Sequence, residues 1–543
     1  MRHTRLLLAV VPLIAEVSSA AAQASPAQDS IAAPRLYSDL GSLTHRIATK
    51  STKAQAYFDQ GLRLYYGFNS EEALRAFREA ARLDPESPMP QWGVAMALGP
   101  NVNFPMDTAA ERQAYAAARE ATRLAAHGDA RDRAWVASLA DRYSPVPGTE
   151  RGKRDTLYAG AMRVLARQYA DDKDAAVLLA ESLMLLHPWD WFTGDGKPVG
   201  SIVEAIGEIE RVLRVDPNHA GACHFYIHAV EQSLTPARAL PCAGRLPALM
   251  PGAGHIVHMP AHIYMRTGNY AEAVRRNQHA AHADEVFIGE QRPKGVYPFY
   301  YAHNLHFLWA AAAMDGQSKV SLKAARDLVA QIPPEIYEQA PLFELIAAVP
   351  TLALARFEMW NDVLGEAAPK ASLRLARTMW HHARGIAYAR SGRPDSALRE
   401  LAALRALAAR IPRDQVVMTT NTAPQVTDLA ARNVEAEIAL ARGRTADGIA
   451  LFRAAVRMED GLRYDEPATW YVPIRQRLGR VLLAADQPAA AEKAFREDLV
   501  RNPENGWSLD GLAKSLKAQG KITASANVMR RFRKAWTRAD VTL

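Results

Sequence analysis

Residues 57–85 read YFDQGLRLYYGFNSEEALRAFREAARLDP and carry the strongest structural pattern in the chain. The pattern is that of two short helices joined by a turn, counted within a 34-residue unit that starts at residue 54. Small residues at positions 8 and 20 let the two helices approach closely, and large residues at positions 4 and 24 fill the seam between them. A proline at position 32 ends the second helix. The residues at positions 4, 8, 20, 24, 27 and 32 are Tyr57, Gly61, Ala73, Phe77, Ala80 and Pro85.

The pattern returns along the chain. Glycine, alanine and proline anchors mark contiguous units that start at residues 186, 220 and 254, further units near 302, 378, 429 and 472, and a last one that contains Trp507 and Gly511. This spacing resembles the tetratricopeptide repeat (TPR) over roughly residues 50 to 530. The resemblance implies an all-α protein, a right-handed superhelical TPR solenoid of helix–turn–helix hairpins. Irregular inserts are expected at residues 99–148 and 187–200.

Composition agrees with a repeat protein. At 543 residues the chain exceeds what one compact core usually serves, whereas a solenoid grows along one axis. The chain has 66 basic and 58 acidic residues, a formal net charge of +8. Because the two signs are mixed, the surface lacks the concentrated positive field of a nucleic-acid binder, and no nucleic-acid partner is expected.

The N-terminus has the pattern of a secretory signal peptide. Arg2 and Arg5 precede a short apolar run, and small residues suited to cleavage follow at 20–24. No other apolar run is long enough to span a bilayer, so we expect a periplasmic or secreted protein whose mature chain has no transmembrane segment. The expected segments are a signal peptide at 1–24, a flexible lead-in at 25–48, an N-terminal TPR and irregular helical segment at 49–148, a central histidine-rich TPR segment at 149–335 and a C-terminal TPR segment at 336–543.

Histidines concentrate in the central segment. Ten of the chain's 16 lie between His219 and His306. Because a helix turns by about 100° per residue, positions 2, 5, 9 and 12 of each first helix share one stripe, and in the TPR family this stripe lines a concave groove. Seven of the twelve stripe positions in the units from 220, 254 and 302 are histidine. The stripe comprises Gly221, His224, His228, Glu231, His255, His258, His262, Met265, His303, His306, Ala310 and Ala313.

Several of these side chains have the spacing of metal ligands. His224 and His228 are four residues apart, as are His258 and His262, so each pair can hold one ion from a single helical turn. Glu231 would add a carboxylate ligand, as in zinc and non-haem iron sites, or serve as a general base. Neighbouring helices pack about 8–10 Å apart, which lets their histidines share one cavity. The candidate ligands are His224, His228, Glu231, His255, His258, His262, His303 and His306.

Two residues modify this expectation. Met265 would add a soft ligand, which favours copper, or would contact a bound molecule. Pro260 lies inside the helix that carries three of the histidines, and it should kink or restart that helix.

The stripe is compatible with three functions. The first is an exported TPR binding protein whose groove binds a transition metal (zinc, iron or copper), a peptide or a small ligand. The second is a metal-dependent enzyme, a hydrolase or oxidase, that uses the same histidines. The third is a metal-free scaffold that holds a peptide or protein partner in the groove. A purely structural polar network, shared with the aromatic insert at 187–200, is the remaining alternative.

Two other features stand out. Cys223 and Cys242 are the only cysteines, and they lie close together in one antiparallel hairpin. A disulfide is expected for an exported protein, with two buried thiols or Cys223 as a metal ligand as the alternatives. Residues 464–475, YDEPATWYVPIR, form either a structured connection between repeats or a ligand-binding end of the groove. The candidates there are Asp465, Glu466, Trp470, Tyr471 and Arg475.

Several longer phrases resemble a group of exported bacterial TPR proteins. They are LGPNVNFPMD (98–107), HAVEQS (228–233), GHIVHMPAHIYMRTGNY (254–270) and NGWSLDGLAKSLKAQG (505–520). Together with the first repeat they span most of the chain. The resemblance implies the fold and export, and it implies no particular reaction.

Overall fold

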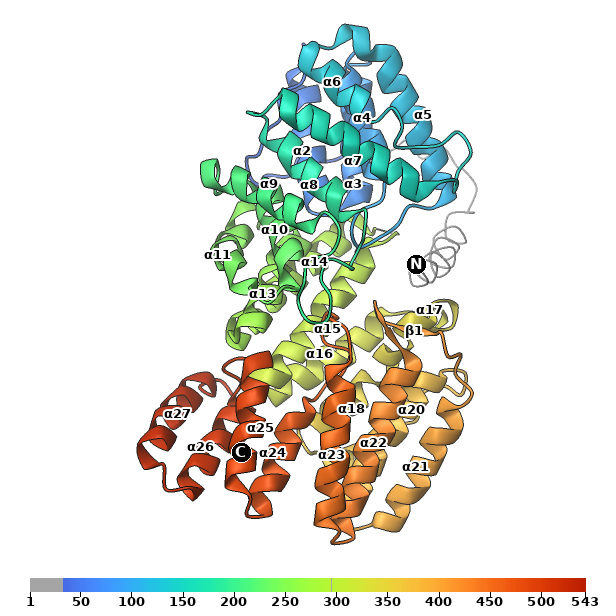
Figure 1. Cartoon of the computed structure of the whole chain (residues 1–543). Helices are drawn as coiled ribbons and strands as arrows, with labels where there is room; N and C mark the ends of the chain where they lie inside the picture. The colour runs from blue at the N-terminus through green and yellow to red at the C-terminus, as the bar shows by residue number, and fades with distance from the viewer. Residues whose placement is uncertain (1–32, 294) are drawn as a thin grey trace. The chain divides into compact units, whose positions relative to one another are not determined.

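The computed structural model of the protein describes residues 33–293 and 295–543, so the expected signal peptide lies outside the described residues. The described chain is helical almost throughout (Figure 1). Its two short strands, β1 (Val416–Val417) and β2 (Asn421–Thr422), form one antiparallel pair. None of the described helices combines the length and the apolar character needed to cross a bilayer. The all-α class predicted from the repeats is therefore confirmed.

The helices pack into two compact units. The first comprises residues 33–263 and 279–301, and the second comprises 264–278 and 302–543. This division comes from packing alone, and the segment boundaries expected from the sequence stay a prediction. The helices α13 (Pro260–Thr267), α14 (Tyr270–Gln291) and α15 (Tyr297–Asp315) contribute residues to both units.

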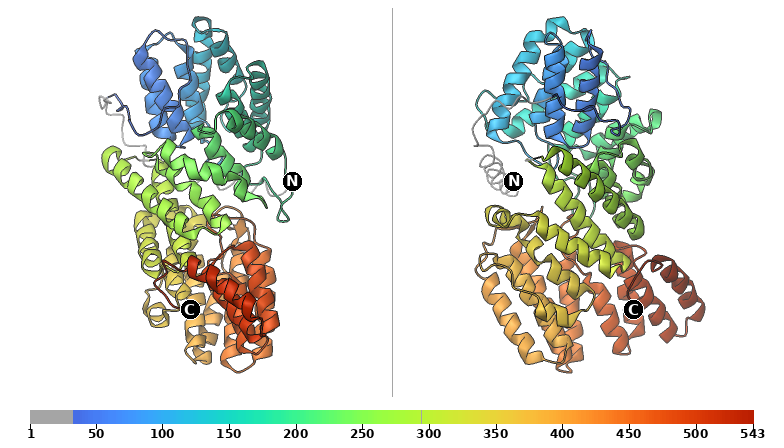
Figure 2. Two further views of the ribbon diagram at one scale, coloured as in Figure 1. Left: turned by 90° about the vertical axis from the view of Figure 1, so that its left-hand side faces the viewer. Right: turned by 180° about the vertical axis from the view of Figure 1, so that it is seen from behind.

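Consecutive antiparallel helices build the first unit (Figures 1 and 2). They are α2 (Thr52–Tyr66), α3 (Ser70–Leu83), α4 (Pro88–Leu98), α5 (Thr108–Leu124), α6 (Ala130–Ser138), α7 (Arg151–Gln168), α8 (Lys173–Met184), α9 (Ile202–Val215), α10 (Ala220–Glu231), α11 (Leu240–Leu249) and α12 (Gly254–His258), with the short 3-10 helices η1 (Ala125–His127) and η2 (Pro236–Ala239).

The second unit repeats the same hairpin four times toward the C-terminus, after a less regular start. Its helices are α16 (Ser318–Gln331), α17 (Pro334–Gln339), α18 (Val349–Arg356), α19 (Trp360–Gly365), α20 (Arg374–Arg390), α21 (Pro394–Ala408), α22 (Ala423–Ala441), α23 (Thr445–Asp460), α24 (Ile474–Ala484), α25 (Pro488–Arg501), α26 (Gly506–Ala518) and α27 (Ile522–Ala535), with the 3-10 helix η3 (Pro341–Ala348).

The first repeat folds as its spacing predicts. The hydroxyl of Ser51 caps α2, and the side chain of Asn69 caps α3, each by accepting a hydrogen bond from a backbone N–H of the first turn. The ring of Phe77 packs directly on Gly61, where an added Cβ would lie 2.6 Å from the ring. This contact is the close helix approach that the small residue at position 8 permits.

Two local details follow from the sequence. The helix that carries His255, His258 and His262 breaks at Met259, so that α12 ends just before Pro260 and α13 begins with it.

In the unit expected to start at 186, the second helix is α9, but the first helix is α8, upstream of the insert at 187–200. The insert therefore lies between the two helices of its hairpin and interrupts it, as the sequence predicted.

The segment before α2 is held along its length. The backbone N–H of Tyr37 donates to Gln60 at 2.8 Å, and that of His45 donates to Asp59 at 2.9 Å. Residues 33–48 form a strap on the first unit, because α2 offers them polar partners. The lead-in expected at 25–48 begins outside the described residues, and its flexibility stays a prediction.

Candidate metal centre

Six predicted ligands come together inside the first unit. His224, His228 and Glu231 lie on α10, and they meet His255 and His258 from α12 and His262 from α13. Their exposed fractions are between 0% and 2%. The sequence predicted an accessible groove stripe, whereas these side chains are interior. The centroids of neighbouring imidazole rings lie between 4.7 and 6.0 Å apart.

Close packing of α10 on the end of α2 makes this arrangement possible. Gly221 lies against the ring of Tyr66, and an added Cβ would be 2.5 Å from that ring. The backbone carbonyl of Tyr66 then reaches the cluster and accepts a hydrogen bond from Nδ1 of His224 at 2.6 Å. A larger residue at 221 would move α10 away from that carbonyl.

Hydrogen bonds at Nδ1 fix the proton positions of three imidazoles. Nδ1 of His228 donates to Oε1 of Glu231 at 2.9 Å, and Nδ1 of His262 donates to Oε2 at 2.5 Å. His224 donates from Nδ1 to a carbonyl in the same way. In a neutral imidazole a proton on Nδ1 leaves a lone pair on Nε2. Each of these rings, in its neutral form, therefore offers Nε2 as a ligand atom, which is the arrangement that outer-shell oxygens impose on metal-binding histidines.

Burial keeps the imidazoles of His224 and His228 neutral. It lowers the pKa of His224 well below 6.5, and the neighbouring His228 lowers it further. Burial also lowers the pKa of His228, although Glu231 opposes the effect. For Glu231 burial alone would raise the pKa, but His262 and His228 outweigh it and hold that pKa well below 4.5. At neutral pH the imidazoles of His224 and His228 are thus neutral, and the carboxylate of Glu231 beside them is ionised.

Three of the imidazoles converge on one point. One ligand nitrogen from each of His224, His228 and His255 lies within 4.8 Å of the others. Nε2 of His224 is 3.1 Å from Nε2 of His255. Nε2 of His228 is fully buried and has no hydrogen-bond partner among the described residues. Beside this trio, Nε2 of His258 lies 2.7 Å from Nε2 of His262.

Aromatic rings contact the trio, one from the insert at 187–200 that the sequence indicated and one, Phe68, that it did not. The ring of Phe68 lies 4.5 Å from His224, 5.8 Å from His228 and 5.4 Å from His255. Trp189, from the insert at 187–200, meets His228 edge-on at 5.8 Å. Phe68 and Trp189 have positive φ angles of 56° and 60°. Such angles cost free energy in non-glycine residues and are concentrated at functional sites.

The remaining candidates of the stripe belong to the second unit. His303 and His306 lie on α15, and Met265 lies in the part of α13 that packs with that unit. The imidazole of His306 is buried and stacks on Trp309 at 5.3 Å. Burial lowers its pKa to about 3, so it is neutral at physiological pH.

Four of the candidates at 464–475 make internal contacts in the second unit: Asp465, Trp470, Tyr471 and Arg475. The carboxylate of Asp465 accepts hydrogen bonds from Thr469 and from the backbone of Glu466. Arg475 pairs with both oxygens of Asp460 at 2.6 and 2.7 Å. Trp470 is buried, and the hydroxyl of Tyr471 donates to Nε2 of His382 at 3.1 Å. These contacts agree with a structured connection between repeats, and a ligand-binding role for the segment stays a prediction.

His382 provides a test of this packing through pH. Burial lowers its pKa to about 4, below the 6.5 of an unfolded chain, so stability is lost as the pH falls from 6.5 toward 4. Burial raises the pKa of Glu459 to about 8 and that of Asp465 to about 6, so these two carboxyl groups stabilise the folded state as the pH falls over the same range. Both proteins contain these carboxyl groups, so their contribution cancels when wild type is compared with His382→Gln. The variant should gain about 2 kcal/mol relative to wild type between pH 7 and pH 5, measured by urea unfolding. A pH-independent difference would contradict a buried, neutral imidazole.

A further group of possible ligands, His45 with Asp172 and Asp174, serves the fold. Asp174 accepts hydrogen bonds from His45 at 2.8 Å, from the Tyr66 hydroxyl at 2.7 Å and from His219 at 3.2 Å. These bonds occupy its oxygens and tie the N-terminal strap to α2, α8 and α10.

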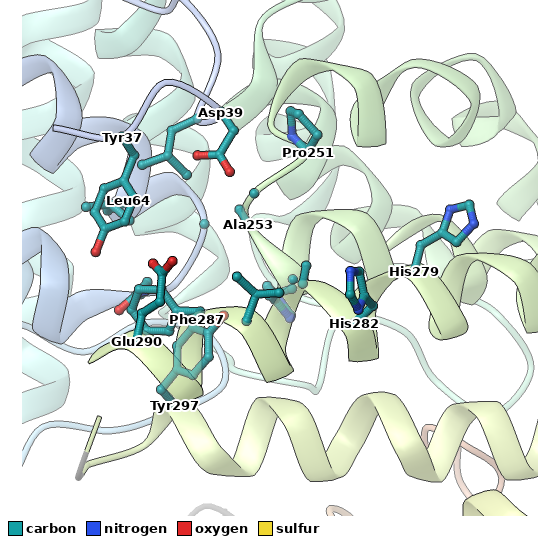
Figure 3. Close-up of a pocket in the computed structure, with 18 of the residues that line it drawn as sticks. Tyr37, Asp39, Leu64, Pro251, Ala253, His279, His282, Phe287, Glu290 and Tyr297 are labelled. Carbon is teal, nitrogen blue, oxygen red and sulfur yellow. The ribbon is translucent and has the colours of Figure 1, made fainter. Parts of the chain in front are cut away.

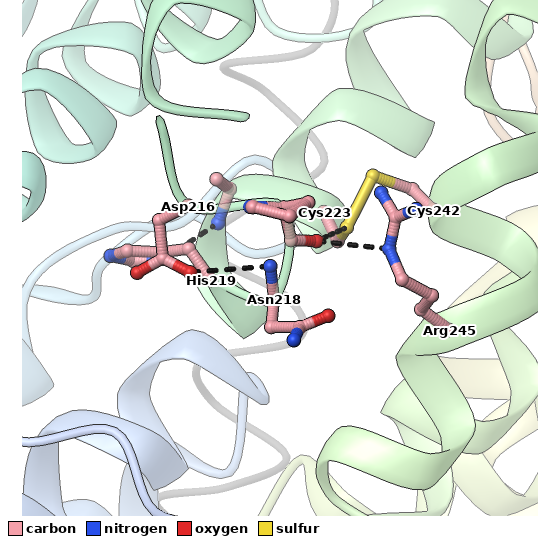
Figure 4. The surroundings of a disulfide bond; sticks show 8 residues. Asp216, Asn218, His219, Cys223, Cys242 and Arg245 are labelled. Carbon is pink, nitrogen blue, oxygen red and sulfur yellow. Dashed lines mark hydrogen bonds between the residues drawn. A yellow bond between two sulfur atoms is a disulfide. The ribbon is translucent and has the colours of Figure 1, made fainter. Parts of the chain in front are cut away.

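Cys223 and Cys242 form a disulfide between α10 and α11 (Figure 4). Their Cα atoms are 5.1 Å apart, within the usual range for such a bond. Nearby, the guanidinium of Arg245 donates to the carbonyl of Pro217 at 3.0 Å. The bond ties α10 to its hairpin partner at the residue that directly precedes His224.

Comparisons with known proteins give the fold context only. No protein-family model matches the chain, and no curated protein matches it. Solved structures with a similar succession of helices include human IFIT1 with m7Gppp-AAAA, at 12% identity, 90% of each chain and a TM-score of 0.32. Yeast Tom70 matches at 11% identity with a TM-score of 0.28, and the match covers 89% of this chain and 91% of the Tom70 chain. A chain of the APC/C hetero-tetramer Cut9–Hcn1 matches at 11% identity with a TM-score of 0.32, and the match covers 85% of this chain and 76% of that chain. These scores are low, and the fold assignment rests on the helix pairs of the chain itself.

Proposed function

We propose that the protein is an exported TPR-type binding protein whose first unit binds one transition-metal ion between His224, His228 and His255. The observation that carries the proposal is the buried Nε2 of His228, which has no hydrogen-bond partner among the described residues and faces two further imidazoles. A buried nitrogen without a partner costs about 1–3 kcal/mol, and a metal ion at that nitrogen would remove the cost. Glu231 would position the ligands rather than bind the ion itself, because both its oxygens accept imidazole protons.

The geometry is compatible with zinc. Two nitrogens that bind zinc at about 2.0–2.1 Å in a tetrahedron lie about 3.3 Å apart. This separation is close to the 3.1 Å between Nε2 of His224 and Nε2 of His255. Imidazole ligands also suit copper and iron, so a competition among the three metals belongs in the test. Three histidines leave one coordination position open, as in catalytic zinc sites. A metal-dependent hydrolase or oxidase is therefore the second candidate function.

Metal content tests the proposal directly. Protein purified without a chelator should carry about one ion per chain by elemental analysis. Glu231→Gln should weaken zinc binding by about 10–100-fold, because an amide N–H facing an imidazole N–H forces one ring to move its proton to Nε2. Affinity is measured by competition with a chromogenic chelator.

Glu210→Gln is the matched control, since Glu210 lies on neighbouring α9 and accepts from the hydroxyl of Tyr226 instead of an imidazole. The control should bind zinc like wild type. A wild-type protein that stays metal-free when zinc, copper and iron are offered would refute the site. What would then remain is a metal-free scaffold with a peptide or protein partner.

Export and protein binding complete the proposal. The disulfide supports an oxidising compartment, which agrees with the secretory pattern at residues 1–24. Helical repeat solenoids present extended surfaces suited to protein partners, which supports a peptide or protein ligand. Fractionation of cells into cytoplasm and periplasm tests the location.

A further inference from the structure

A cavity of about 360 Å³ lies against the histidine cluster within the first unit (Figure 3). The strap, the end of α2, the loop before α12 and one face of α14 form its walls. Most of the interior is apolar or aromatic. The residues that give it this character are Tyr37, Leu40, Leu64, Pro251, Phe287 and Tyr297.

Charged groups lie toward the outside of this cavity. Arg35 pairs with Glu290 at 3.1 Å, and both side chains are about half exposed. In Figure 3 Glu290 lies with the aromatic rings at one end, while His279 and His282 follow along α14 at the other. An apolar interior with a polar rim, at this volume, is typical of a site for a small organic molecule.

The cavity reaches the proposed metal site through one residue. His255 is part of the cavity wall and also contacts Nε2 of His224 at 3.1 Å. The ring of Tyr300 packs on His255 at 4.5 Å and supports it from another side. A molecule in the cavity would therefore have one end beside a metal ligand.

We propose that this cavity binds a small, largely apolar or aromatic molecule whose anionic, metal-coordinating head group reaches the ion beside His255. The inference rests on the metal site proposed above. The body of the ligand would lie between Leu64, Phe287 and Tyr297, and the open coordination position of the ion would take the head group.

Two hydroxamates that share one head group test the inference with the zinc-loaded full-length protein. Benzohydroxamate has an aromatic body, and acetohydroxamate has only a methyl group. Calorimetry should show that benzohydroxamate binds at least about tenfold more tightly, because its ring buries more apolar surface. Val286→Trp should remove this preference, since Val286 lines the cavity and is 48% exposed, so a larger ring fits the fold and fills the space.

Val203→Trp is the matched control, because Val203 is a 62% exposed valine on α9 outside the cavity lining. It should keep the wild-type preference. Elemental analysis of the same samples reports on the metal site separately. Zinc-loaded protein with equal affinity for both hydroxamates, or with a preference that survives Val286→Trp, would overturn this inference alone. Protein that takes up no metal would overturn it together with the proposed function.

Discussion

A His228→Gln variant is expected to lose metal binding, with an affinity at least about a hundredfold below that of the wild-type protein. His228 supplies the buried nitrogen that has no internal hydrogen-bond partner in the described structure, so its loss leaves the ion with two of three ligands. Glutamine is the informative replacement, because its amide still donates to Glu231 and keeps that carboxylate satisfied. Zinc competition on purified protein gives the affinity.

The control for this variant is His127→Gln, which changes an exposed histidine of η1 in the same unit. It should bind zinc like wild type. Circular dichroism and the thermal midpoint of the metal-free proteins establish that both variants fold. A folded His228→Gln protein with wild-type zinc affinity would place the ion elsewhere or exclude it.

Removing the disulfide through Cys223→Ala and Cys242→Ala is expected to lower the free energy of unfolding of the first unit by about 3 kcal/mol. The two cysteines are 19 residues apart, and the bond restricts that loop in the unfolded chain. Alanine is chosen because both positions are buried and tolerate no new polar group. Urea unfolding, followed by a probe in the first unit, measures the change.

A reductant gives the complementary measurement. It should destabilise the wild-type protein by about the same amount and leave the double variant unchanged. If the reductant left wild type unaffected, the two sulfurs would not be joined in solution, and the support that the bond gives to export would disappear.

Local spacing made the fold predictable. Pairs such as Gly61 with Phe77 recur at fixed separations, and each pair sets one helix contact within about 20 residues of sequence. The histidine stripe was predictable for a related reason, because helical periodicity places His224 and His228 on one face whatever surrounds them. Pro260 likewise predicts its own helix break.

The environment of the stripe was not predictable in this way. Phe68 meets His224 from the turn after the first helix, more than 150 residues earlier in the chain. Trp189 contacts His228 from the insert at 187–200, which has no repeat periodicity from which its position could be predicted. The histidines that these rings contact are buried, whereas an open groove was expected. An aromatic residue in the turn Gly67–Asn69 was the one available signal, because turn residues are usually polar.

The ring of Phe68 has a consequence for charge balance at the site. The ring of Phe68 brings no counter-charge, and the imidazoles of His224 and His228 are neutral. The single charge of Glu231 would leave one positive charge of a divalent cation in excess. Such an excess favours hydroxide, carboxylate or a similar anion over a neutral molecule at the open position. It would also make the occupied site a Lewis acid strong enough to lower the pKa of a bound water.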